Sequence, residues 1–185
     1  MAGETFAKIA RDLVPHEPPQ KGLRFASVAV IVRDRQVPSV LLIRRAERVG
    51  DPWSGQVAFP GGKMQEGDRS AKDTAIRETM EEVGIDLGRY GEFLGYGGVA
   101  TTHTGTMSVV PSVFELKESV DVKPNSEVAS FRWAELEQLL APSSRSTFGL
   151  IRDGKVAEVP AYKVGDYTVW GLTYRILNSF LEERP

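Results

Sequence analysis

Three glutamates about one helical turn apart are the residues of this chain whose types and spacing could do chemistry. Glu78, Glu81 and Glu82 stand at i, i+3 and i+4, so on a helix they share one face. Like charges this close destabilise a helix unless a cation balances them. Carboxylate oxygens are the ligands that Mg²⁺ and Mn²⁺ prefer, so the spacing predicts a site for one of these ions. The alternative is a solvated acidic face with Arg77 and Lys72 as counter-charges.

The residues on either side predict how a helix would present these glutamates. Ser70 is a suitable N-cap, with Asp73 three residues later, and Gly84 can end the helix in the left-handed conformation. Upstream, Gly61 and Gly62 form a turn after a proline, and glycine lets the backbone approach a ligand closely. We therefore expect a backbone carbonyl from this turn to join the carboxylates around a metal ion.

This stretch resembles the signature sequence of the Nudix hydrolases: Gly, five residues, Glu, seven residues, then R-E-U-x-E-E-x-G-U, where U is bulky and apolar. The matching residues are Gly62, Arg77, Glu78, Glu81, Glu82, Gly84 and Ile85. The chain departs from the pattern in two ways. Asp68 replaces the first Glu, with one extra residue before Arg77, and Thr79 stands at the first U position. We expect the long side chain of Arg77 to reach Asp68 across the extra residue.

The resemblance implies an α/β fold, the Nudix-type α/β/α sandwich with a mixed central β-sheet, and a metal-dependent pyrophosphohydrolase. It implies that the metal ligands are Glu78, Glu81, Glu82 and Gly62, the last through its carbonyl, with Mg²⁺ or Mn²⁺ as the cofactor. The implied catalytic residues are Glu81, Glu82 and Arg77. Some members of the family use a further acid outside the signature, and the candidates here are Glu115 and Glu118.

Three features resemble the branch of the family that cleaves coenzyme A. They are the extra residue before Arg77, the sequence GQVAFPGGK at residues 55–63 and the sequence WGLTYRIL at residues 170–177. We therefore expect hydrolysis of coenzyme A or an acyl-coenzyme A to phosphopantetheine and adenosine 3′,5′-bisphosphate. Cationic side chains near the signature are the expected phosphate-binding residues, because a guanidinium matches phosphate geometry. These are Arg44, Arg45, Arg48 and Lys63.

Two other functions stay open on the sequence alone. One keeps the chemistry but acts on ADP-ribose, another nucleotide sugar, a dinucleotide or a damaged nucleotide. The other is a non-catalytic Nudix module that binds nucleotide or RNA. Residues 50–54 differ from the usual sequence of the coenzyme A branch, which weighs against that substrate. The complete set of acids favours catalysis over binding alone.

The rest of the sequence predicts a sheet covered by helices on both faces. Residues 25–33 and 40–44 are nearly continuous apolar runs, typical of strands buried on both sides. Further strands are expected at residues 92–100, 107–116, 156–163 and 167–169, with a loop at 142–146. Helical patterns cover residues 6–14, 134–140 and the segment from 170 onward. His103 lies in a threonine-rich turn, where either a general base or an ordinary turn residue is possible.

The composition suits a single domain over residues 1–185, with an N-terminal helix and connector at 1–23. A net charge of −2 provides no basic surface for nucleic acid or membrane, and the absence of cysteine excludes disulfides and thiolate catalysis. The run at 25–32 is far too short to span a membrane, so we expect a cytoplasmic protein. Apolar residues at 6–14 and 172–181 lead us to expect a homodimer.

Overall fold

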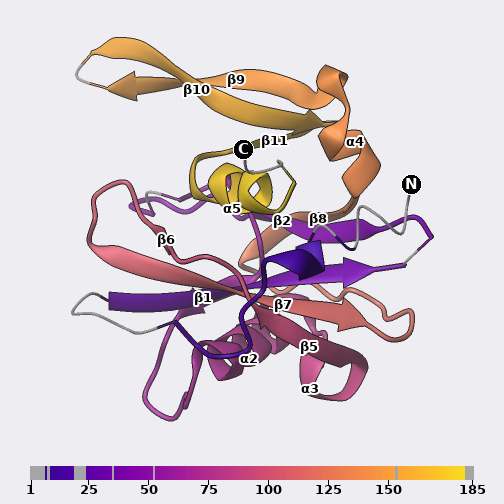
Figure 1. Cartoon of the computed structure of the whole chain (residues 1–185). Coiled ribbons are helices and arrows are strands. Elements are labelled where there is room, and N and C mark those ends of the chain that lie inside the picture. The colour runs from indigo at the N-terminus through magenta and orange to yellow at the C-terminus, as the bar shows by residue number, and fades with distance from the viewer. Residues whose placement is uncertain are drawn as a thin grey trace.

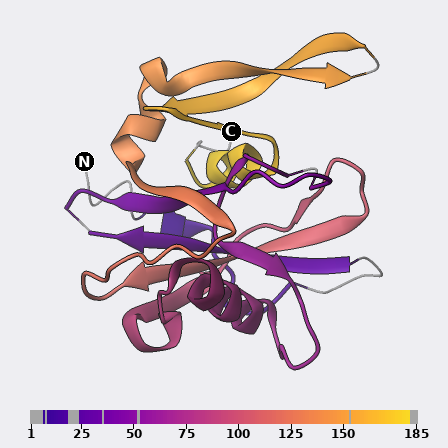
Figure 2. The ribbon, with the colours of Figure 1, turned by 180° about the vertical axis from the view of Figure 1, so that it is seen from behind.

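The structure, a computed structural model, describes residues 7, 9–18, 24–34, 36–51, 53–152 and 154–181. Figures 1 and 2 show a larger sheet with helix α2 (Ala71–Val83) on one side and helix α5 (Gly171–Leu181) on the other. A second, three-stranded sheet lies beyond α5 (Figure 1). The predicted mixed α/β architecture, with its mixed central sheet, is confirmed.

The remaining elements of the described chain are short connections and the strands of the two sheets. The larger sheet holds β1 (Arg24–Arg33), β2 (Ser39–Arg45), β3 (Val57–Ala58), β4 (Gly61–Lys63), β5 (Gly91–Tyr96), β6 (Ala100–Thr101), β7 (Met107–Leu116) and β8 (Val128–Glu135). The smaller sheet holds β9 (Arg145–Arg152), β10 (Lys155–Val164) and β11 (Tyr167–Trp170). Helices α3 (Leu87–Tyr90) and α4 (Leu136–Leu140) and the 3₁₀ helix η1 (Pro142–Ser144) connect them.

Strand β1 is the centre of the larger sheet and explains its two apolar faces. It pairs antiparallel with β2 and β4 and parallel with β7. Side chains alternate along a strand, so Ala29 and Ile31 pack in the cluster that contains Ala75 of α2. Val30 packs on the opposite face, in the cluster that contains Ile176 of α5. The continuous apolar run therefore reflects burial on both sides, as its sequence predicts.

Several predictions of secondary structure are wrong. Residues 12–14 are not helical, since Val14 forms a β-bridge with Tyr96. Residues 134–135 belong to β8 and residue 170 belongs to β11, so the helices α4 and α5 begin later than predicted. Residues 92–100 do not form one strand, because β5 ends at Tyr96 and the two-residue β6 follows after a break. A Cβ on Gly97 would lie 2.6 Å from the Phe180 ring, so the backbone here packs against α5. Residues 145 and 146 begin β9 rather than ending a loop. This strand is an edge strand that pairs only with β10, and it carries few buried residues that would create a pattern.

The described N-terminal residues pack into the body of the chain. Residues 7 and 9–11 are helical, while much of the predicted helix and connector lies outside the described residues. Ile9 is buried in the same cluster as Ile176 and Leu177 of α5. Ile9 and Leu13 therefore pack against α5 within one chain, whereas Val14 is 44% exposed, and the homodimer stays a prediction. No helix in the described ranges is long and apolar enough to cross a membrane.

Candidate active site

Helix α2 presents the glutamates, and its ends are the ones that the sequence predicts. The Ser70 side chain accepts a hydrogen bond from the Asp73 backbone N–H at 3.1 Å, which caps the first turn. Gly84 ends the helix at a φ of 68°, and its N–H donates to the Met80 carbonyl. Ala75 packs on the sheet, which turns the neighbouring helix face toward β4.

Glu82 is the most buried carboxylate of the cluster. Its Oε2 accepts a hydrogen bond from the Gly61 backbone N–H at 2.9 Å, and Arg45 Nη1 lies 3.8 Å from its Oε1. Burial raises the pKa of Glu82 to about 7, an effect that the Gly61 N–H opposes and the nearby charge of Glu78 increases. The charged form of this carboxylate is therefore disfavoured. A cation bound beside it would stabilise the charged form.

Glu78 lies directly against the glycine turn. A Cβ placed on Gly62 would be 2.5 Å from the Glu78 carboxyl carbon, so only glycine leaves room for the carboxylate here. Arg77 Nη1 donates to Glu78 Oε1 at 2.8 Å. Burial raises the pKa of Glu78, and the Arg77 guanidinium opposes that rise. Two partly desolvated carboxylates thus flank the backbone of Gly61 and Gly62.

Arg77 reaches Asp68 across the extra residue, as we expect from the sequence. Its Nε donates to Asp68 Oδ1 at 3.1 Å and its Nη2 donates to Oδ2 at 2.9 Å, a bidentate pair. The same Nη2 donates to the Lys63 carbonyl at 3.1 Å. Asp68 also accepts from the Thr74 hydroxyl, and chiefly because of Arg77 its pKa is lowered to about 2. The insertion therefore keeps the link between the arginine and the first acid of the signature.

Glu81 is the outermost of the three glutamates. Its side chain is 55% exposed, and Arg77 Nη1 lies 3.4 Å from its carboxylate. Across the part of the chain that the structure describes, no three acidic or histidine side chains are arranged so that they could close around one metal ion. Arg77 lies among the carboxylates and holds Glu78 and Glu81 by hydrogen bonds.

The four predicted phosphate-binding residues separate into two groups. Arg44 and Arg45 are neighbours on β2, so their side chains leave opposite faces of the sheet. Arg45 lies between Glu82 and Asp51, while Arg44 donates to the Asp166 carbonyl at 2.7 Å. Arg48 pairs with Glu127 at 3.1 Å. Only Arg45 and Lys63 of the four line the cleft beside the carboxylate cluster. Arg44 and Arg48 do not line it.

A cleft of about 1020 Å³ adjoins the carboxylate cluster. Gly61, Gly62 and Lys63 of β4 line it, together with the beginning of α5 and with parts of β9 and β10. The WGLTYRIL sequence at residues 170–177 thus supplies one of its walls. His103 also lines the cleft, and so do two residues that the sequence does not single out, Trp53 and Arg175. Both lie in stretches that bear on the resemblance to the coenzyme A branch, residues 50–54 and 170–177, but only the fold shows that these two side chains reach the cleft.

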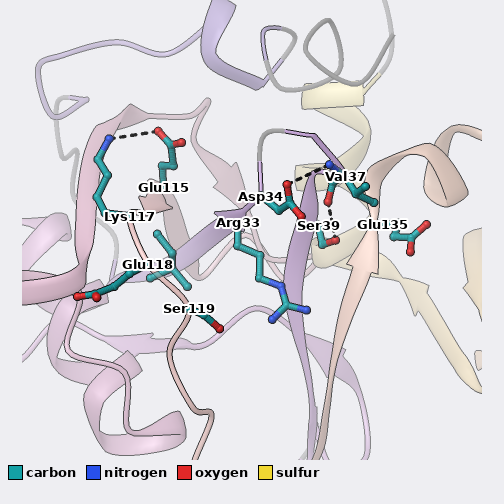
Figure 3. Close-up of a pocket in the computed structure, with 10 residues that line it drawn as sticks. Arg33, Asp34, Val37, Ser39, Glu115, Lys117, Glu118, Ser119 and Glu135 are labelled. Atoms are coloured by element: carbon teal, nitrogen blue, oxygen red, sulfur yellow. Dashed lines mark hydrogen bonds and ion pairs between the residues drawn. The ribbon is translucent and has the colours of Figure 1, made fainter.

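The two candidates for a further acid, Glu115 and Glu118, lie elsewhere. Glu115 pairs in register with Val32 of β1, whereas Gly62 pairs with Ser27. Five residues along a strand correspond to roughly 17 Å. The two acids line a separate pocket of about 610 Å³ with Arg33 and Asp34 (Figure 3). Because β7 runs parallel to β1, the carboxyl end of β7 lies far from the Nudix signature. The structure therefore does not bring these two acids to the carboxylate cluster.

Comparison with known proteins places this geometry in a family. The model of the NUDIX domain matches residues 23–152. The chain is 32% identical over 171 residues to the uncharacterized Nudix hydrolase NudL of Photorhabdus laumondii, covering 90% of each protein. It is 31% identical over 164 residues to the human mitochondrial coenzyme A diphosphatase NUDT8, covering 86% of this chain and 70% of that one.

Two further similarities differ in how much of each protein they cover. An uncharacterized protein of Schizosaccharomyces pombe is 35% identical over 158 residues, which are 72% of this chain but only 47% of that protein. This chain therefore spans about half of that relative. A MutT/nudix family protein from Enterococcus faecalis superposes with a TM-score of 0.57 at 18% identity, over 96% of this chain and 71% of that one. At this identity the superposition supports the fold alone.

Proposed function

Because this chain belongs to the Nudix hydrolase family, we propose that it hydrolyses a diphosphate that joins a nucleoside to a second group, using Mg²⁺ or Mn²⁺. We propose further that the substrate is coenzyme A or an acyl-coenzyme A, which would yield phosphopantetheine and adenosine 3′,5′-bisphosphate. The relative NUDT8, named as a coenzyme A diphosphatase, supports this choice. The resemblance to the coenzyme A branch in the extra residue before Arg77 and in the two sequences at 55–63 and 170–177 supports it too.

The observation that carries the proposal is the junction of the carboxylates and the cleft. Gly61 donates its N–H to Glu82 and also lines the cleft, and Gly62 touches Glu78 and lines the same cleft. A substrate in the cleft would therefore have a phosphate group beside the glutamates. A volume of about 1020 Å³ is at the upper end of what small-molecule sites provide, which suits a ligand as long as coenzyme A.

The donor set of the cluster fits a hard divalent cation. Glu78 and Glu82 are carboxylates whose burial raises their pKa, so a nearby positive charge would favour their ionised form. We propose that Glu78, Glu81, Glu82 and the carbonyl of Gly62 would hold the ion. When bound, such an ion neutralises phosphate oxygens and makes the attacking water more acidic.

The chain's own residues would then orient the reacting groups. Arg77 would fix Glu78 through its 2.8 Å hydrogen bond and is itself fixed by Asp68. Glu81, exposed and only weakly held by Arg77, would accept a hydrogen bond from the attacking water. Arg45 and Lys63 would contact phosphate oxygens, because both line the cleft on the side of the glutamates.

The test is a comparison of kcat/KM for coenzyme A, dephospho-coenzyme A and ADP-ribose with Mg²⁺ present and products identified. We expect coenzyme A to be preferred over dephospho-coenzyme A by about tenfold or more, because one charge-assisted contact to the 3′-phosphate is worth about 1.5–3 kcal/mol. Lys63→Met should reduce this preference. Lys163→Met is the matched control, since Lys163 is an exposed lysine outside the cleft lining.

The other possible outcomes separate the alternatives. A tenfold or larger preference for ADP-ribose would reject coenzyme A as the substrate and leave the hydrolytic chemistry standing. If no compound of the three gave a metal-dependent product, coenzyme A would be rejected as the substrate. Catalysis itself would be rejected in favour of a binding module only if other nucleotide sugars, dinucleotides and damaged nucleotides also gave no product.

A further inference from the structure

Trp53 is a large aromatic residue on the rim of the cleft. It lies in the connection between β2 and β3, and 44% of the residue is exposed. It lines the same cleft as Gly61, Gly62 and Lys63. Tryptophan is strongly buried on average, so a half-exposed indole beside a cleft has no evident role in the core. Part of the Trp53 surface is therefore open to a ligand in the cleft.

Hydrogen bonds hold the backbone of Trp53 and of the residues that follow it. The Trp53 N–H donates to Asp51 Oδ1 at 2.9 Å, and the Trp53 carbonyl accepts from the Gln56 N–H at 3.2 Å. The Ser54 N–H donates to the Asp51 carbonyl at 3.1 Å, and the Ser54 hydroxyl accepts from the Arg48 N–H at 2.8 Å. The side chain thus extends from a backbone segment that hydrogen bonds already hold. Less entropy is therefore lost in ordering this segment when a ligand binds.

Asp51 also links this turn to the carboxylate cluster. Its Oδ2 accepts a hydrogen bond from Arg45 Nη2 at 3.0 Å, and Arg45 Nη1 lies 3.8 Å from Glu82. The pKa of Asp51 is lowered, first by the Trp53 N–H and further by Arg45, so the carboxylate is charged at neutral pH. One carboxylate therefore holds both the aromatic residue and the arginine beside Glu82.

We propose that Trp53 is a substrate-binding residue that stacks on the nucleobase of the substrate. This inference rests on the function proposed above and deepens it, because it assigns the adenine end of the ligand to the β2–β3 turn. A purine has a broad π face that stacks on an indole whatever its hydrogen-bonding pattern. The wall formed by residues 170–176 also carries two aromatic residues, Trp170 and Tyr174. The Trp170 ring stacks on Phe148 at 4.4 Å and the Tyr174 ring packs against Tyr162 at 4.8 Å, so both already have a ring partner within the chain.

The stacking can be tested by binding of AMP, which contains the base and has no diphosphate to hydrolyse. Calorimetry with Mg²⁺ present would measure Kd for AMP and for ribose 5-phosphate, which lacks the base. We expect Trp53→Ala to raise the Kd for AMP about tenfold, equivalent to about 1.4 kcal/mol in binding free energy. Trp53→Phe should retain most of the affinity, because it keeps an aromatic face. Phe131→Ala is the control, since Phe131 is 39% exposed and lies outside the cleft lining.

The base-free probe makes the interpretation specific. Ribose 5-phosphate should bind the wild type and all three variants equally. An AMP affinity of Trp53→Ala within twofold of the wild type would overturn the proposal. An equal loss of affinity for both probes would also overturn it, and so would the absence of measurable AMP binding by the wild type at millimolar concentration. Failure of coenzyme A hydrolysis would leave this test intact, because neither probe is turned over.

Discussion

Replacing Asp68 by Asn should lower the free energy of unfolding by about 2 kcal/mol at pH 7. The Asp68 side chain is only 8% exposed and forms a bidentate pair with Arg77, so solvent screens the interaction little. In the folded protein its pKa is lowered from 3.8 to about 2. A change of that size in the pKa of one carboxyl group corresponds to about 2.4 kcal/mol. Asparagine keeps the size of the side chain and removes its charge.

The dependence on pH separates lost charge from lost packing. The folded-state pKa of Asp68 lies below the unfolded value, so its stabilisation is complete above the unfolded pKa and disappears as pH falls through the folded pKa. The difference in unfolding free energy between wild type and Asp68→Asn should therefore decrease to about 1.3 kcal/mol at pH 3. Urea unfolding followed by tryptophan fluorescence at several pH values from neutral to acidic measures this difference directly.

Arg69→Gln provides the control for this series. Arg69 pairs with Asp73 at 2.9 Å, but the Arg69 side chain is 88% exposed. Its replacement should therefore lower the free energy of unfolding by at most about 0.5 kcal/mol at any pH. If Asp68→Asn were as stable as the wild type at pH 7, the pair with Arg77 would contribute nothing. A loss that stayed the same at acidic pH would assign the effect to hydrogen bonding and shape, and the charge argument would fail.

Three further changes test the site. Glu82→Gln should reduce turnover by more than tenfold, about 1.4 kcal/mol in barrier, without lowering the Tm of the metal-free protein, because burial disfavours the Glu82 charge. Gly62→Ala should lower both Tm and turnover, since its Cβ would meet the Glu78 carboxylate, whereas Gly98→Ala should be neutral because its Cβ would meet nothing within 4 Å. Arg45→Ala should reduce kcat/KM at least tenfold, and Arg44→Ala much less, in steady-state assays. Equal effects from the two arginine variants would contradict this placement.

The parts of the site that the sequence predicts are those set by short-range interactions. Ser70 and Gly84 cap α2 because their preferred backbone conformations and hydrogen bonds involve only the neighbouring turn. Contacts between distant segments carry no such signal. Arg44 and Arg45 are adjacent and chemically identical, yet only the pairing of β2 decides that Arg45 faces Glu82. Trp53 likewise reaches the cleft only because of the fold. The single domain over residues 1–185 stays a prediction.

The glycine turn explains why the carboxylates and the cleft must meet at one point. At Gly61 the φ angle is 155°, and a Cβ would lie 2.3 Å from the Ser27 carbonyl, so only glycine can pair with β1 here and still donate its N–H to Glu82. At Gly62 a side chain would fill the space of the Glu78 carboxylate. Two different steric requirements thus act on adjacent residues that both line the cleft. A larger side chain at Gly62 would push Glu78 and helix α2 away from β4, whereas one at Gly61 would push β4 away from β1. Either change would separate the carboxylates from any phosphate group bound in the cleft.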